Sequence, residues 1–238
     1  MSRRGYNTSE VFMNGTIKRR LIVSAALFIL FIAAVMAVSF IDVAAIGPMG
    51  TKVGLSSVNA AFRDAVGYSK TWCDVSEVLG AYPFGAALGL AIVAVIDFVK
   101  TKKVGADMWT LAVFYAALAL VYLFFELVIV NYRPVAVDGE TEASFPSSHT
   151  MLALFSSVTT AHIIAGRQRK RWIKTTTAAV LAVLCVAEIT ARALSGVHWL
   201  TDIVAALLIG GALAVLQTAV ADILKNRAAK KSGATRAQ

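Results

Sequence analysis

Runs of about 20 apolar residues recur along the chain, and they constrain the fold more than any other feature. Each run is long enough to cross the roughly 30 Å hydrocarbon core of a bilayer. In lipid the backbone must satisfy its own hydrogen bonds, so such runs form helices. The 238 residues are 58% hydrophobic, with a mean hydropathy of +0.71, which is more apolar than a soluble domain. We therefore predict an all-α, polytopic membrane protein without a separate soluble domain.

The apolar runs predict a bundle of six transmembrane helices. They lie at about residues 21–40, 78–99, 108–130, 148–165, 175–193 and 199–221. The first run follows a basic triplet and could be a signal peptide, but it is longer than a usual signal sequence, which favours an uncleaved helix. The stretch 53–66 is mildly amphipathic, and we expect it to lie at the membrane interface.

These spans divide the chain into three parts. Residues 1–20 form an N-terminal segment, 21–222 the membrane domain, and 223–238 a basic tail that we expect to be disordered after Asn226. The two cysteines, Cys73 in a loop and Cys185 within a predicted span, do not indicate a disulfide.

The net charge of +9 is distributed along the chain in a way that predicts topology. Most lysines and arginines fall in the N-terminal segment, the loops 100–107 and 167–174, and the tail, which share one side if there are six spans. Basic residues are enriched on the cytoplasmic side, so we expect a plasma (inner) membrane protein with both termini in the cytoplasm. Nucleic-acid binding would need a soluble basic module with aromatics, and none is present.

Ionisable residues at the ends of spans or within them indicate a functional site, because such groups are costly in a membrane. On the six-span map, four of them converge at the extracytoplasmic ends of four different spans. Each residue alone could be an interface anchor or a structural polar group, but their convergence favours a site. The full set is Glu126, Arg133, His149, Glu188, Arg192, His198 and Asp202.

The residue types in this set suit phosphate chemistry. His198 and Asp202 are four apart and share one helix face, so the carboxylate can orient the imidazole as a nucleophile. His149, at the free N–H groups of a helix start, can donate a proton to a leaving group. Arg133 and Arg192 offer planar forks for phosphate oxygens. Two histidines and an aspartate could instead bind zinc, but the neighbouring arginines would repel a cation, so we expect neither metal nor cofactor.

The motifs that carry these residues resemble the type 2 phosphatidic acid phosphatase (PAP2) superfamily. The family pattern is K-x6-RP, then PSGH, then SR-x5-H-x3-D. The chain has Arg133-Pro134, a Pro-Ser-Ser-His motif at 146–149, and Arg192 followed at the matching spacings by His198 and Asp202. The motifs cover residues 126–202, and the six-span layout extends the resemblance to most of the chain. The compact size is typical of a bacterial member.

The resemblance implies a function and a role for each residue. His198 would accept the phosphoryl group, His149 would act as the acid, and Arg133, Ser147, Ser148 and Arg192 would bind phosphate. The substrates of membrane members are lipid phosphates such as phosphatidic acid, phosphatidylglycerol phosphate and polyprenyl diphosphates such as undecaprenyl diphosphate. We therefore expect a metal-independent phosphatase that works on a membrane lipid at the extracytoplasmic face.

Three positions depart from the family pattern. Ser148 replaces the glycine of PSGH, Ala191 replaces the serine before the second arginine, and Glu126 stands where the family has lysine. Glu126 puts an anion near an anionic substrate. It could be neutral because it is buried, or it could orient an arginine or bind a hydroxyl of the headgroup. The alternative function that Glu126 raises is a lipid-phosphate binding or transport protein with weak or no turnover.

Overall fold

The computed structural model describes residues 14–136 and 140–235, so residues 1–13 of the predicted N-terminal segment and the last three of the tail lie outside it. The described part is helical apart from turns, loops and isolated bridges. Its elements are α1 Gly15–Phe40, the short 3-10 helix Pro48–Gly50, α2 Ser56–Val66, α3 Lys70–Leu79, α4 Tyr82–Thr101, α5 Ala106–Leu127, α6 Ser148–Arg167, α7 Arg171–Leu194 and α8 Leu200–Thr235. The predicted all-α class is confirmed.

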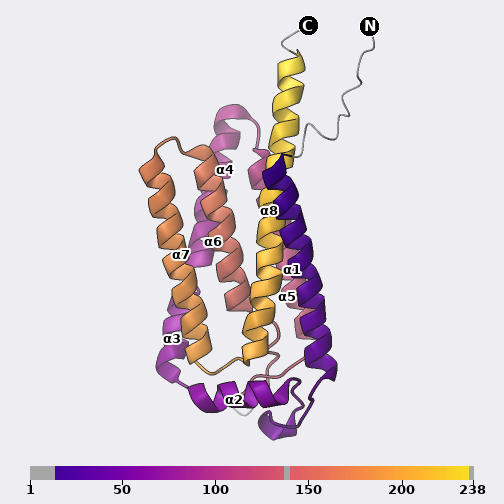
Figure 1. Cartoon of the computed structure of the whole chain (residues 1–238). Helices are drawn as coiled ribbons and strands as arrows, with labels where there is room; N and C mark the ends of the chain where they lie inside the picture. Colours follow the sequence, from indigo (N-terminus) through magenta and orange to yellow (C-terminus); the bar gives the residue numbers. More distant parts are fainter. Residues whose placement is uncertain (1–13, 137–139, 236–238) are drawn as a thin grey trace, which may run out of the picture.

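The long helices lie side by side as a bundle and run alternately in opposite directions, so that α1 begins and α8 ends at the same end (Figure 1). Five helices in the described residues are long and apolar enough to span a membrane: 15–40, 70–101, 106–127, 171–194 and 200–230. These five agree with five of the six predicted spans. The remaining one, α6, has the length but not the hydropathy, so the described helices do not confirm the count of six.

The polar character of α6 follows from its burial among other helices (Figure 1). Its hydroxyl side chains find partners on its neighbours: Tyr115 Oη donates to Ser156 Oγ at 3.0 Å, and Tyr82 Oη lies 2.9 Å from Ser157 Oγ. Polar side chains are tolerated in a membrane bundle where they bond across helices rather than face lipid. Its hydroxyl groups therefore bond within the bundle, which accounts for its lower hydropathy.

The second predicted span is divided near its outer end. The turn at Gly80 and Ala81 separates α3 from α4, and Pro83 lies in the first turn of α4. Proline suits this position because the N–H groups of a first turn need no partner within the helix. The chain therefore breaks here into two helices, which leaves α3 free to approach α7.

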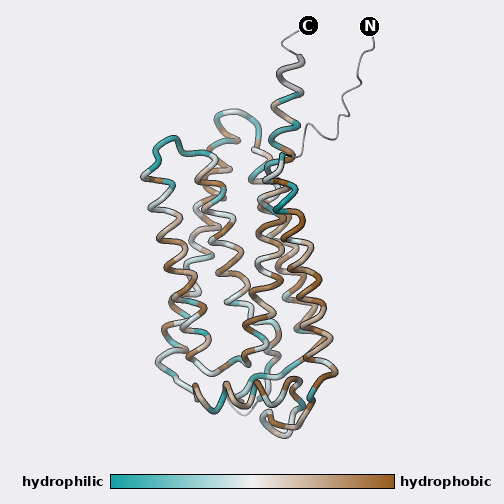
Figure 2. Tube along the Cα trace, viewed as in Figure 1, coloured by the Kyte–Doolittle hydropathy of each residue, from teal (hydrophilic) through white to brown (hydrophobic). Residues whose placement is uncertain are grey.

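The tail after Asn226, which we expected to be disordered, continues α8 as a helix to Thr235. The segment 226–231 is rich in alanine, lysine and arginine, all of which favour helix. α8 therefore extends past the other helices as a basic projection (Figure 2). At this same end, Arg167 donates to Asp97 at 2.6 Å and to Asp107 at 2.8 Å, and so ties α6 to α4 and α5.

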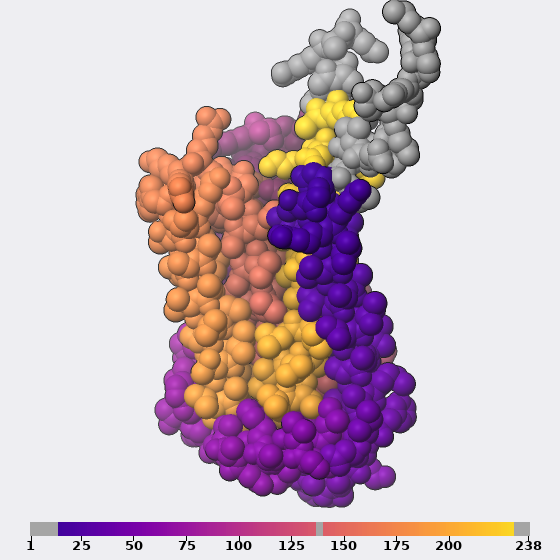
Figure 3. Space-filling view, in the orientation of Figure 1, coloured from indigo at the N-terminus to yellow at the C-terminus, as the bar shows by residue number. Residues whose placement is uncertain are grey.

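The opposite end is closed by α2, which lies across the bundle (Figures 1 and 3). The stretch predicted as amphipathic forms this helix. Asn59 of α2 donates through Nδ2 to Thr201 Oγ1 at 3.0 Å and accepts from Thr201 N at 3.2 Å. This reciprocal pair fixes α2 to the first turn of α8.

An aromatic cluster joins α1 and α5 to the loop before α6. The ring centroids of Phe31 and Phe125 lie 5.9 Å apart, and those of Phe125 and Phe145 lie 5.5 Å apart, both edge to face. Such pairs stabilise beyond their buried area. Phe145 directly precedes the Pro-Ser-Ser-His motif, so the cluster holds that motif against the bundle.

Close packing of α6 on α8 depends on Gly210. A Cβ placed there would lie 2.9 Å from the Met151 carbonyl oxygen and 3.2 Å from its Cα, whereas one at Gly211 would meet only side-chain carbons at 3.6 Å. We expect Gly210→Ala to force the helices apart and to lower the free energy of unfolding by about 1–3 kcal/mol. Unfolding by SDS in mixed micelles measures this, with Gly211→Ala as the matched control. Equal stability of the two variants would contradict the prediction.

Candidate active site

The predicted site residues gather at one end of the bundle, the end that α2 covers. Arg133 follows α5, His149 lies in the first turn of α6, Arg192 in the last turn of α7, and His198 just before α8. Four helix ends therefore supply the four residues, as the motif spacing predicts.

The buried imidazole of His198 lies beside Asp202. His198 Nδ1 is 3.5 Å from Asp202 Oδ2, and the two residues are 4% and 0% exposed. Neither ring nitrogen of His198 has a hydrogen-bond partner in the described part of the chain. Since Asp202 lies on the Nδ1 side, Nε2 is the nitrogen free to attack.

The Asp202 carboxylate is held in place by other groups. Trp199 N donates to Oδ2 at 3.0 Å, and Asn131 Nδ2 donates to Oδ1 at 3.2 Å. The backbone carbonyl of Asp202 accepts from Ser147 N at 3.2 Å, which joins α8 to the start of α6. Asp202 therefore orients His198 from a fixed position.

Burial lowers the pKa of His198 below its ordinary value, and the nearby arginines act in the same direction. Asp202 opposes the shift, because its carboxylate favours the imidazolium form. The net direction keeps His198 neutral at neutral pH, which is the form that a nucleophile needs.

A small polar pocket of about 50 Å³ opens onto His198. Arg133, Ser148 and Glu126 contribute to its wall. A buried imidazole, a guanidinium and the first turn of a helix therefore face one small volume, which suits the binding of a compact anion.

His149 is paired with Arg192 rather than with His198. Arg192 Nη2 lies 3.0 Å from His149 Nδ1. Because a guanidinium only donates hydrogen bonds, Nδ1 must accept, and a proton on the ring must sit at Nε2. This arrangement assigns Nε2 as the proton-carrying atom of His149.

Ser147 is fully buried, and its hydroxyl donates to Thr150 Oγ1 at 3.2 Å. It is absent from the walls of the pockets at this end of the described chain, whereas Ser148 belongs to two of them. The structure thus places Ser148, and not the Ser147 side chain, where a phosphate could contact it.

Glu126 is not covered by other parts of the described chain. It also forms no ion pair with Arg133 among the described residues. Arg133 Nη2 lies instead 3.0 Å from Glu142 Oε2. The interpretation that Glu126 binds a hydroxyl of the substrate remains, since Glu126 lines the polar pocket.

Sequence reasoning missed several residues that hold the site together. Glu188 does not bond Arg192 directly; Ser76 of α3 donates to Glu188 Oε1 at 2.9 Å and lies 3.5 Å from Arg192 Nη1. Glu77 contacts Arg192, and Asn131 contacts Asp202. These residues lie outside the motifs, and only their polar nature near a helix end could have indicated them.

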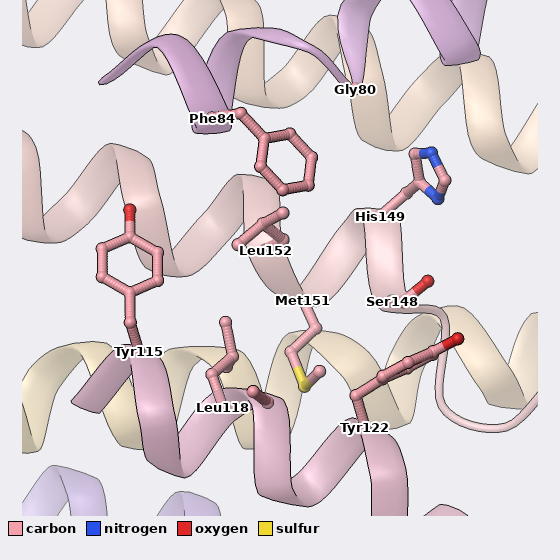
Figure 4. A pocket seen from close by; sticks show the side chains of 10 residues that line it. Gly80, Phe84, Tyr115, Leu118, Tyr122, Ser148, His149, Met151 and Leu152 are labelled. Atoms are coloured by element: carbon pink, nitrogen blue, oxygen red, sulfur yellow. The ribbon is translucent and has the colours of Figure 1, made fainter. Parts of the chain in front are cut away.

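An apolar pocket of about 350 Å³ lies between α4, α5 and α6 and ends at the site (Figure 4). Phe84, Leu118 and Leu152 belong to its apolar wall, and His149 and Ser148 lie at one end. A pocket with a long apolar part and a polar end is suited to an amphiphilic ligand.

The described residues contain no group of three or more His, Cys, Asp or Glu side chains that could hold a metal ion. His198 and Asp202 are a pair without a third such ligand, and arginines lie nearby.

The fold and site define a helical membrane protein with the histidines and arginines of a phosphate-ester site. Residues 109–224 match the PAP2 superfamily. The predicted resemblance is thereby confirmed.

The fold resembles that of a solved membrane protein. The structure is described as the first transmembrane PAP2 type phosphatidylglycerolphosphate phosphatase from Bacillus subtilis. The two chains are 21% identical with a TM-score of 0.59, over 82% of this chain and 93% of the other. No curated protein sequence matches the chain.

The lowered pKa of His198 predicts its behaviour in solution. An ordinary histidine is half protonated at about pH 6.5, so we expect His198 to remain largely neutral there and to protonate only at lower pH. The chain has three histidines, so ¹⁵N imidazole NMR in detergent, with His149→Gln and His162→Gln for assignment, measures this directly. A His198 that titrates at or above the ordinary value would refute the prediction.

Gly80 allows the His149 ring to lie against the turn between α3 and α4. A Cβ at Gly80 would lie 2.6 Å from His149 Cδ2 and 3.0 Å from Nε2, whereas one at Gly85 of α4 would meet nothing within 4 Å. We expect Gly80→Ala to displace the ring and to lower phosphate release from lipid phosphates about ten- to a hundredfold. Gly85→Ala is the control, and equal activity of both variants would argue against this role of the ring.

Proposed function

We propose that the chain is an integral membrane phosphatase that hydrolyses the phosphate or diphosphate of a lipid at the extracytoplasmic face. The observation that carries the proposal is the buried His198 ring, whose unpartnered nitrogens lie at the polar pocket beside Arg133 and Ser148. The family match over 109–224 supports a phosphatase. The apolar pocket that ends at His149 supports a lipid substrate.

The proposed reaction has two steps through a phosphohistidine. His198 Nε2 attacks phosphorus, the bond from phosphorus to the ester oxygen breaks, and His149, as the imidazolium that forms once phosphate draws Arg192 away from Nδ1, gives its Nε2 proton to the departing oxygen. Water then attacks phosphorus, gives a proton to His149, and displaces His198 as inorganic phosphate forms. Asp202 stabilises the charge that develops on His198, while Arg133 and Arg192 stabilise the phosphoryl oxygens.

The distribution of charge supports the proposed face of the membrane. The site lies at the bundle end opposite the basic loops and the projection of α8. Since basic segments favour the cytoplasm, the site would face the extracytoplasmic side and both termini the cytoplasm of the plasma (inner) membrane.

A second candidate is a lipid-phosphate binding protein with little turnover. It is favoured by the acidic groups around the arginines: Glu142 pairs with Arg133, Glu77 pairs with Arg192, and Glu126 lines the polar pocket. These anions oppose binding of a second anion, and they are compatible with slow or absent catalysis.

A trapping experiment separates the two functions. We expect detergent-purified protein, mixed with ³²P-labelled lipid mono- and diphosphates and quenched rapidly in base, to carry a base-stable, acid-labile label. His198→Ala should carry none, and its phosphate release should fall by about three orders of magnitude. Release without a trapped label would reject the phosphohistidine route. Lipid binding with no release by either protein would support the binding protein instead.

A further inference from the structure

The Glu77 side chain reaches into the site from α3 and contacts two of its residues at once. Glu77 Oε1 lies 3.2 Å from Arg192 Nη1, and Oε2 lies 3.5 Å from His149 Nε2. Glu77 precedes every family motif and lies outside the matched segment 109–224. Its role must therefore be argued from geometry alone.

Both terminal nitrogens of Arg192 already have partners in this arrangement. Arg192 is 2% exposed; Nη1 faces Glu77 and Ser76, and Nη2 faces His149 Nδ1. Its Nε has no hydrogen-bond partner in the described chain. A phosphate that binds Arg192 through Nη1 must therefore compete with Glu77 for that nitrogen.

The other oxygen of Glu77 faces the atom that would protonate the leaving group. Arg192 fixes the His149 proton at Nε2, and Glu77 Oε2 is the anion on that side. One carboxylate thus contacts an arginine that would bind a phosphoryl oxygen and a histidine that would meet the ester oxygen. Those two oxygens are joined through a single phosphorus atom, as the two of Glu77 are joined through a single carbon.

We propose that Glu77 is a positioning residue whose carboxylate occupies the place of the substrate's phosphate ester, and that phosphate displaces it on binding. This inference rests on the proposed function in assigning Arg192 to phosphate and His149 to the leaving group. The carboxylate contacts both side chains through two oxygens on one carbon, as a phosphoryl oxygen and the ester oxygen would through one phosphorus, and it competes with the substrate for them.

The exposed Glu77 side chain can move away from Arg192 without disturbing the rest of the site. Its side chain is 62% exposed, whereas that of Arg192 is 3% exposed. Ser76 stays bonded to Glu188, and Gly80 keeps the turn against His149, so the rest of the wall is held independently of Glu77. An ion pair with one exposed partner is weak and easily replaced.

Competition predicts that removing the carboxylate strengthens phosphate binding. We expect Glu77→Gln and Glu77→Ala to lower the Kd for inorganic phosphate and for orthovanadate about three- to tenfold. Isothermal titration of the full-length protein in detergent near neutral pH measures this without any need for turnover. A merely structural Glu77 would shift the Kd upward or leave it unchanged, because its loss would disorder Arg192.

Asp74→Asn is the matched control. Asp74 lies on the same helix, three residues before Glu77, and pairs with Lys70 at 2.8 Å. The Asp74→Asn substitution removes the same charge without touching the site. The Kd of this variant for phosphate should therefore equal that of the wild type. A Kd for Asp74→Asn that falls as far as that for Glu77→Gln would attribute the effect to general charge and overturn the proposal.

The remaining outcomes are also decisive. Binding in the Glu77 variants that is unchanged or weaker, or phosphate that binds to neither wild type nor variants, would overturn the proposal. Tighter phosphate binding by the Glu77 variants, with no hydrolysis of any lipid phosphate, would support the role of Glu77 and reject the phosphatase function. Hydrolysis by the wild type with no change of Kd in the Glu77 variants would support the phosphatase function and reject the role proposed for Glu77.

Discussion

The interaction on which the site depends is the contact of His198 with Asp202 at the start of α8. A buried imidazole and a buried carboxylate are each costly to desolvate, and they remain together because the carboxylate is bonded on both oxygens by Trp199 N and Asn131. The same aspartate binds Ser147 N through its backbone, which sets the first turn of α6. The helix ends that carry the motifs are therefore joined at this residue.

Much of this arrangement could be predicted from sequence, because the constraints are local. Apolar length fixes helices in lipid, and the spacing from Arg192 through His198 to Asp202 fixes which groups share the turn between α7 and α8. The side on which the site lies relative to the basic loops follows from counting spans. The error was also local: the tail after Asn226 is helical rather than disordered.

The partners of the site residues could not be predicted, because they depend on how helices far apart in sequence approach one another. Arg192 and Glu188 are spaced for a pair within α7, yet α3 packs against α7 and places Ser76 and Glu77 between and beside them. Asn131 lies only two residues before Arg133, but its contact with Asp202 spans 71 positions of the chain. The hydrophobic periodicity of the sequence does not predict such contacts.

The polar surface of α6 has a consequence for how the protein is made. Helices leave the translocon one at a time, and a segment enters lipid according to its own hydrophobicity. α6 falls short of that measure, and while its Ser156 can meet Tyr115 of α5, its Ser157 bonds the Leu181 carbonyl of α7, which is synthesised later. The polar side chains of α6 therefore bond both to helices made before it, since Ser157 also lies 2.9 Å from Tyr82 Oη of α4, and to α7, made after it.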